Sequence, residues 1–188
     1  MGWSHSVIGV AEMGLAAIIH RVYNREAFGA PLYKKDTIRK IIADARIEIT
    51  KCRQLCYLAA SIADDRGFKE ARKYVSMIKV AAPQCALKIL DEAMQIHGAH
   101  GVSQDSQLSE KWQNIRILRI ADGPDIVQLN TVTKVELAEN AANGFGKSVS
   151  GVNRNIEKYG IFEKIRAKRA AVGDEKVSTI SPIAKARM

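Results

Sequence analysis

The sequence predicts an all-α protein: an up-and-down four-helix bundle with an additional short helix and a basic C-terminal extension. Apolar residues recur in steps of three and four along most of the chain, which is the period of a half-buried helix. Glycines interrupt this pattern where helices would end. No alternation of apolar and polar residues bounded by turn signals indicates a strand. The pattern therefore favours helices that pack against one another.

Three long apolar stripes define the first helices. The first stripe covers residues 7–22. The second covers 38–63 and is closed by Gly67, and the third covers 71–96 and is closed by Gly98. The third segment carries further apolar residues outside its stripe, so we expect it to be the most buried helix. At ~30 residues and ~1.5 Å per residue, the second and third helices would each be ~45 Å long.

Two more helices complete the predicted bundle. A shorter one is expected between Ser106 and Leu118, and a final one follows Pro124, which suits a first helical turn, and runs toward Ala142. Pro83 lies inside the third segment, where it removes one backbone hydrogen bond and should kink or restart the helix. Long antiparallel helices with short connections form an up-and-down bundle.

The chain of 188 residues is long enough for one domain with its own core. We assign residues 1–143 to the bundle and residues 144–188 to a basic, partly helical tail. The tail holds ten Lys or Arg residues and four Asp or Glu residues, which gives +6 of the formal net charge of +9. A basic tail can bind nucleic acid or an anionic membrane. Because no nucleic-acid-binding motif accompanies the charge, a solvated extension is favoured.

The three cysteines cannot all pair. Cys52 and Cys56 are four residues apart on one predicted helix, where side chains are neighbours but rarely have disulfide geometry. We therefore expect three reduced thiols in or near the core of an intracellular protein. No apolar run approaches ~20 residues, so no transmembrane helix is expected. The N-terminus also lacks the features of a secretory signal.

Three glycine-containing motifs follow the predicted helices in order. They are Arg-Glu-Ala-Phe-Gly at 25–29, Gln-Ile-His-Gly-Ala-His-Gly at 95–101, and Arg-Ile-Ala-Asp-Gly-Pro-Asp at 119–125. This order and spacing resemble the C-terminal helical domain of acyl-CoA dehydrogenases over roughly Val7 to Glu139. The chain is most similar to the subgroup that carries Ala-Asp-Gly-Pro-Asp where most members carry Tyr-Glu-Gly-Thr.

The resemblance implies that Asp122 is the catalytic base. The family's base removes the α-proton of a thioester while the β-hydrogen leaves as hydride to flavin N5. Such a base needs a pKa raised by burial, and the thioester oxygen needs hydrogen-bond donors. From the residues alone, Asp122 could instead cap the last helix, and the two roles are compatible. Ile126 and Gln128 stand where the subgroup usually carries Glu and His.

The resemblance also implies FAD as cofactor, held across a subunit boundary. Arg25 would reach the pyrophosphate of the neighbour's FAD, and Phe28 would pack on that cofactor. Gln95, Gly98 and Ala99 match a Gln-x-x-Gly-Gly turn that contacts FAD of the partner subunit. The expected cofactor-binding set also includes Pro124.

Simpler roles are open for several of these residues. Arg25 could interact with the carbonyl groups at the end of the first helix, with Phe28 as a core anchor. His97 and His100 have the spacing of a ligand pair, but nothing nearby supplies further ligands. No metal site is therefore expected.

The resulting hypothesis is FAD-dependent α,β-dehydrogenation of fatty acyl-CoA thioesters, by an enzyme or by the C-terminal part of one. The family's N-terminal helical domain and β domain are not in this chain. Expected partners are a fatty acyl-CoA substrate and either identical copies or a fuller subunit; no nucleic acid is expected. The alternatives are a non-catalytic interaction module that keeps the family fold, or an adaptor that uses its basic tail. Residues 186–188, Ala-Arg-Met, have the form of a peroxisomal signal, so we expect a peroxisomal or mitochondrial location.

Overall fold

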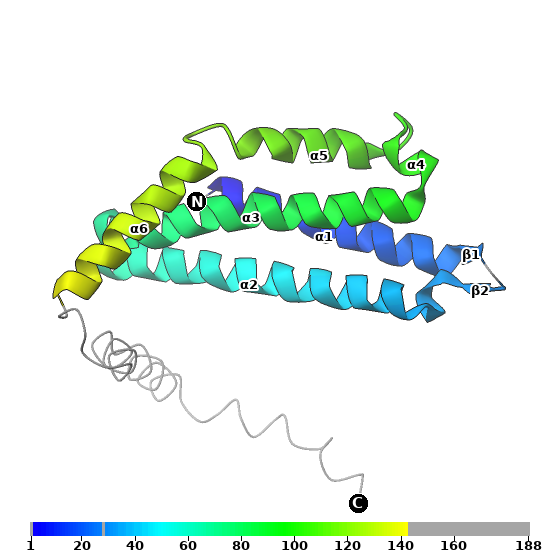
Figure 1. The fold of residues 1–188 in the computed structure, drawn as a ribbon, viewed down its shortest axis with the longest axis horizontal. Coiled ribbons are helices and arrows are strands. Elements are labelled where there is room, and N and C mark those ends of the chain that lie inside the picture. The colour runs from blue at the N-terminus through cyan, green and yellow to red at the C-terminus, as the bar shows by residue number, and fades with distance from the viewer. Residues whose placement is uncertain (1, 28, 143–188) are drawn as a thin grey trace, which may run out of the picture. The chain divides into compact units, whose positions relative to one another are not determined.

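Four helices lie side by side and alternate in direction (Figure 1). They are α1 (Gly2–Asn24), α2 (Asp36–Arg66), α3 (Phe68–His97) and α5 (Gln107–Leu118). The computed structural model describes residues 2–27 and 29–142. Within these residues, the arrangement confirms the predicted all-α, up-and-down four-helix bundle. A further helix, α6 (Asp125–Ala142), follows α5, as the sequence predicted.

Helix α3 is the central element of the bundle. It packs against α1, α2 and α5, and α1 also packs against α2. Its stripe and its additional apolar residues are buried together, which explains why α3 is the most buried helix, as predicted. The largest fully buried side chains come from α1, α2 and α3 and are Leu15, Ile18, Val22, Ile49, Cys56, Ile78 and Leu90.

The helix ends follow the signals in the sequence. Gly67 is the single residue between α2 and α3, so these helices must run antiparallel. Ser106 caps α5, because its hydroxyl accepts a hydrogen bond from the backbone N–H of Leu108 at 3.2 Å. The cysteines at 52, 56 and 85 are buried and unpaired by disulfides, which confirms the predicted reduced thiols.

Three features differ from the sequence expectations. Helix α3 continues through Pro83, so of the expected kink or restart the restart does not occur. Packing on three sides outweighs the one backbone hydrogen bond that proline removes. A short hairpin of β1 (Glu26–Ala27) and β2 (Ala30–Pro31) follows α1, with a 3-10 turn at Leu32–Lys34 after it. A short helix, α4 (Ala99–Val102), stands between α3 and α5.

Helix α1 is more apolar than expected. The most apolar 18-residue window of Ser4–Asn24 has a mean hydropathy of 1.3. By length and composition alone this helix could cross a membrane, which was not expected from the sequence. In the bundle, 39% of its most apolar window is buried. The stripe at Val7, Ala11, Leu15 and Ile18 faces the core, which is the behaviour of a core helix.

Met1–Leu137 form one compact unit. The basic tail predicted at 144–188, including the Ala-Arg-Met sequence at 186–188, lies outside the described residues. The boundary at residue 143 and the role of the tail therefore stay predictions.

The turn from α3 into α4 brings two backbones together at Gly101. A Cβ atom at this position would lie 2.5 Å from the carbonyl oxygen and 2.7 Å from the Cα of Met94. Gly101 is also buried. Only a residue without a side chain therefore lets α4 fold back on the last turns of α3.

We predict that Gly101→Ala destabilises the bundle by about 1–3 kcal/mol, since the backbone of Met94 would have to move. Gly9→Ala is the matched control: a Cβ there meets no atom within 4 Å. Alanine in the helix interior should stabilise the protein by roughly 0.5–1 kcal/mol. Urea unfolding followed by circular dichroism measures both changes. Equal effects of the two substitutions would contradict the close approach at Gly101.

Candidate functional site

The loop that joins α5 to α6 carries Asp122 at one end of the bundle (Figure 1). Asp122 is exposed and has a φ of 53°, the one positive value at a non-glycine residue within the described residues. Asp and Asn tolerate this left-handed conformation better than most residues. No hydrogen bond of the Asp122 carboxylate is found within the described part of the chain, so that group is free to accept a proton from outside.

Asp122 does not cap α6. The carbonyl oxygen of Pro124 accepts hydrogen bonds from the backbone N–H groups of Val127 at 2.9 Å and Gln128 at 3.3 Å. Pro124 therefore occupies the capping position, and α6 begins at Asp125. The helix-capping role considered for Asp122 is wrong, which leaves its side chain available for another role.

The side chain of Lys79 on α3 binds this loop through three hydrogen bonds. Its ammonium group donates hydrogen bonds to the carbonyl oxygens of Leu118 at 2.6 Å, Ala121 at 2.8 Å and Gly123 at 3.0 Å. These carbonyls include the last residue of α5, where the helix dipole favours a cation. The peptide group before Asp122 and the peptide group after Gly123 are thereby fixed to the central helix.

A second set of contacts closes the two ends of the loop. Arg119 Nε donates to Asp125 Oδ2 at 2.7 Å, and the backbone N–H of Asp125 donates to the carbonyl of Arg119 at 3.2 Å. Gln84 of α3 donates to the same carboxylate oxygen at 3.3 Å. The other oxygen, Asp125 Oδ1, is buried and has no hydrogen-bond partner.

Gln128 supports Asp122 from α6. Its side-chain nitrogen donates to the carbonyl of Asp122 at 3.3 Å. Gly123 has a φ of 92°, and a Cβ there would lie 2.9 Å from the same nitrogen. Glycine at 123 is therefore needed both for the conformation of the turn and for space beside Gln128.

Arg25 lies at the other end of the bundle, where α1 leads into the β1–β2 hairpin (Figure 1). Its carbonyl accepts a hydrogen bond from the backbone N–H of Leu32 at 3.0 Å, while its side chain is exposed. The rings of Tyr23, before the hairpin, and Tyr33, after it, stack with their centroids 4.9 Å apart. Phe28 lies outside the described residues.

The turn after α3 lies at this same end. Gln95, Gly98 and Ala99 are all exposed. The backbone N–H of Gly98 closes α3 by donating to the carbonyls of Met94 and Gln95, and its φ is 66°. A Cβ on Gly98 would meet no atom within 4 Å, so a ligand can approach the backbone closely there.

The structure thus separates the expected site residues into two groups. Lys79, which marks the Asp122 loop, and Gln95 are 16 residues apart on α3, or about 24 Å along its axis. Arg25 lies at the Gln95 end, because α1 and α3 run in the same direction (Figure 1). One bundle therefore places Asp122 at one end and the expected cofactor contacts Arg25, Gln95 and Gly98 at the other.

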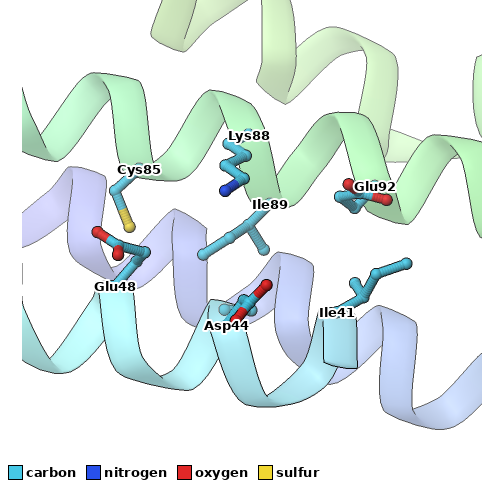
Figure 2. A pocket seen from close by; sticks show the side chains of 8 residues that line it. Ile41, Asp44, Glu48, Cys85, Lys88, Ile89 and Glu92 are labelled. Carbon is cyan, nitrogen blue, oxygen red and sulfur yellow. The ribbon is translucent and has the colours of Figure 1, made fainter. Parts of the chain in front are cut away.

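A groove between α2 and α3 has no counterpart in the sequence predictions. Figure 2 shows Ile89 among the charged side chains that line it, with Cys85 at one end and Ile41 at the other. Hydrogen bonding with Cys85 lowers the pKa of the Cys52 thiol, while hydrogen bonding with Cys52 and burial raise the pKa of the Cys85 thiol. Neither group of expected site residues lines this groove.

The two histidines of the α3–α4 turn do not converge. Their ring centroids are 6.2 Å apart, and His97 Nδ1 lies 2.8 Å from the carbonyl oxygen of Ala93. Among the residues that the structure describes, no group of three or more His, Cys, Asp or Glu side chains is placed to hold a metal ion.

Comparison with known proteins identifies the family. Residues 2–137 match the model of the acyl-CoA dehydrogenase C-terminal domain. The chain belongs to the acyl-CoA dehydrogenase family. This membership confirms the resemblance seen in the glycine-containing motifs, and the helical bundle is the fold that the resemblance implied.

Individual relatives agree with this assignment. Acyl-CoA dehydrogenase family member 11 of Rattus norvegicus is 46% identical over 134 residues, which are 71% of this chain and 17% of that protein. Probable acyl-CoA dehydrogenase FadE2 of Mycobacterium tuberculosis is 45% identical over 131 residues, which are 70% of this chain and 32% of that protein. Butyryl-CoA dehydrogenase from Megasphaera elsdenii superposes with a TM-score of 0.66 at 28% identity, over 71% of this chain and 34% of that one. The chain thus spans between 17% and 34% of the length of these relatives.

Sequence reasoning missed the contacts that hold the acyl-CoA dehydrogenase-like loop at 119–125. Lys79, Gln84 and Arg119 were not among the expected site residues, although they fix the backbone around Asp122. One signal was present: Lys79 stands between the buried residues Ile78 and Val80 of the most buried helix. A lysine in such a position needs acceptors for its ammonium group.

Proposed function

We propose that this chain is the C-terminal bundle of an FAD-dependent acyl-CoA dehydrogenase and supplies parts of two active sites. The proposal rests on the distance between Asp122 at one end of the bundle and Arg25, Gln95 and Gly98 at the other, which corresponds to about 24 Å along α3. The resemblance implies that the base acts beside the flavin of its own subunit, whereas the arginine and the glutamine contact the FAD of the neighbouring subunit. The opposite ends of one bundle fit these two roles.

Asp122 would act as the base. Its carboxylate accepts the α-proton of an acyl-CoA thioester, and its fixed backbone holds the accepting oxygen in place. FAD, when bound, accepts the β-hydrogen as hydride. Asp122 is exposed in this bundle, so the burial that such a base needs would come from the domains that cover this end in a complete subunit.

The other end would bind the cofactor of a neighbouring subunit. The exposed guanidinium of Arg25 can form charge-assisted hydrogen bonds with a pyrophosphate. Gln95 offers a donor and an acceptor, and the open space at Gly98 allows close backbone contact. We include Phe28 and Ala99 in this site on the resemblance. Pro124, the remaining expected cofactor contact, lies in the Asp122 loop at the opposite end of the bundle. A fatty acyl-CoA substrate and a peroxisomal or mitochondrial location belong to the same proposal.

Flavin absorbance distinguishes this proposal from a non-catalytic module. The chain is joined to, or co-expressed with, an N-terminal helical domain and a β domain of the family. Purified protein that is yellow and reduces its flavin on addition of an acyl-CoA supports the enzyme. Colourless protein that still assembles through the bundle would instead support an interaction module.

The proposal predicts that the bundle associates with further copies, because each cofactor site needs two subunits. Helix α6 exposes apolar side chains on its outer surface, at Ile126, Val127, Leu129 and Leu137. Light scattering at micromolar concentration should show an oligomer, and Leu129→Lys should dissociate it. Asn130→Lys, at an exposed polar position of the same helix, is the control. A monomeric wild-type protein would contradict the prediction.

Asp122→Asn should lower turnover of the reconstituted enzyme by a factor of about 100 or more, because asparagine cannot take the proton. Folding should be nearly unchanged, since asparagine tolerates the left-handed conformation at this position. Asp105→Asn makes the same chemical change at an exposed aspartate in another turn and should leave turnover unaltered. Normal turnover of the Asp122→Asn enzyme would remove Asp122 from the mechanism.

Arg25→Ala should mainly weaken cofactor retention. Loss of a charge-assisted contact of about 1.5–3 kcal/mol corresponds to a flavin Kd raised by roughly 10-fold or more. Equilibrium dialysis or flavin fluorescence measures the change. Arg72→Ala, at an exposed position on α3, should leave the Kd as it is. Equal retention by both variants would show that Arg25 does not contact the cofactor.

A further inference from the structure

We infer that Lys79 is a positioning residue for Asp122: its ammonium group anchors the α5–α6 loop to α3 and fixes the backbone that carries the proposed base. The role of Asp122 as base rests on the proposed function. The anchoring of the loop does not, because it follows from the contacts of Lys79 alone.

All three protons of the Lys79 ammonium group have an acceptor. The carbonyl oxygens of Leu118, Ala121 and Gly123 lie 2.6, 2.8 and 3.0 Å from Nζ, and a lysine ammonium has three donors and no acceptor. The side chain is partly buried between two buried neighbours on α3. Its charge is therefore compensated by the loop, and the loop cannot move away without leaving that charge unpaired.

Every carbonyl from residue 121 to residue 124 is hydrogen-bonded. Lys79 binds the oxygens of Ala121 and Gly123, Gln128 binds that of Asp122, and the first turn of α6 binds that of Pro124. Four consecutive peptide groups are thus fixed. This explains how Asp122 keeps a φ of 53°, a conformation that costs free energy at a non-glycine residue unless its surroundings hold it.

The ends of the loop are held independently. Arg119 and Asp125 are joined by a side-chain ion pair and a backbone hydrogen bond. Gln84, five residues after Lys79 on α3, contacts the same carboxylate. Lys79 and Gln128 together fix the middle of the loop, and the Asp122 carboxylate has no hydrogen bond within the described residues. A base on such a backbone needs little reorganisation when substrate binds.

Hydrogen exchange on the 188-residue chain tests the anchoring without any need for activity. Lys79→Met keeps a similar unbranched side chain and removes the three donors. The backbone amides of Ile120 and Ala121 donate to the carbonyl of Ile117 in the last turn of α5, and that of Asp125 donates to the carbonyl of Arg119. These three amides should exchange at least about tenfold faster, the factor for losing one hydrogen bond to a charged group. Amides in the middle of α3 should keep their rates.

Lys73→Met is the matched control. Lys73 lies on the same helix, with a side chain that is 12% exposed, and it forms an ion pair with Glu136 of α6. Its loss should leave the exchange of the loop amides unchanged. If Lys79→Met does not fold, Lys79→Gln replaces it, because the shorter amide cannot reach three carbonyls. The inference would be overturned if the loop amides of the folded variant exchanged at the wild-type rate. An equal increase in the exchange rates of loop and core amides would overturn it too.

The reconstituted flavoenzyme gives a second readout. Lys79→Met should lower kcat by roughly 10- to 100-fold, the scale for a misplaced catalytic group, while flavin retention is unchanged. In Asp122→Asn enzyme the same substitution should cause no further loss, since Lys79 acts through Asp122. Independent, multiplicative losses would overturn the positioning role. An enzyme without turnover would refute the proposed function, whereas the exchange experiment would still decide the anchoring.

Discussion

The packing of α3 against three neighbouring helices is the constraint on which both ends of the candidate site depend. α3 is 30 residues long and is buried on the sides that face α1, α2 and α5. Lys79 fixes the Asp122 loop to one part of α3, and the turn at Gln95–Gly98 ends the same helix. Because a packed helix is stiff along its axis, the separation between the two ends is set by the number of residues between them.

This geometry is the basis for our proposal that each active site needs more than one subunit. The bundle cannot bring Arg25 and Asp122 to the same flavin ring, since they lie at opposite ends (Figure 1). It can instead present each group to a different neighbour. The exposed apolar side chains of α6 and the exposed carboxylate of Asp122 are both surfaces that further domains or subunits would cover. Burial of the base would then depend on assembly.

The conformation at Asp122 also shows how a fold can hold an unfavourable backbone at a functional position. A left-handed aspartate between Ala121 and Gly123 is maintained by hydrogen bonds to the peptide groups around it, while its own side chain is left free. The hydrogen bonds come from α3 and α6, which are separate in sequence from the loop. The strain is local, and the elements that hold it belong to the bundle.

The sequence by itself determined the helices, their order and the family. Apolar periodicity placed α1, α2 and α3, and Gly67, Gly98, Ser106 and Pro124 marked helix ends, because these signals act through neighbouring residues. Only the tertiary structure decided the rest. Lys79 donates hydrogen bonds to carbonyl groups 39 to 44 positions further along the chain. Helix α3 continues through Pro83, and Pro124 rather than Asp122 caps α6. Each outcome depends on which helices pack together, and local patterns contain no information on contacts between distant segments.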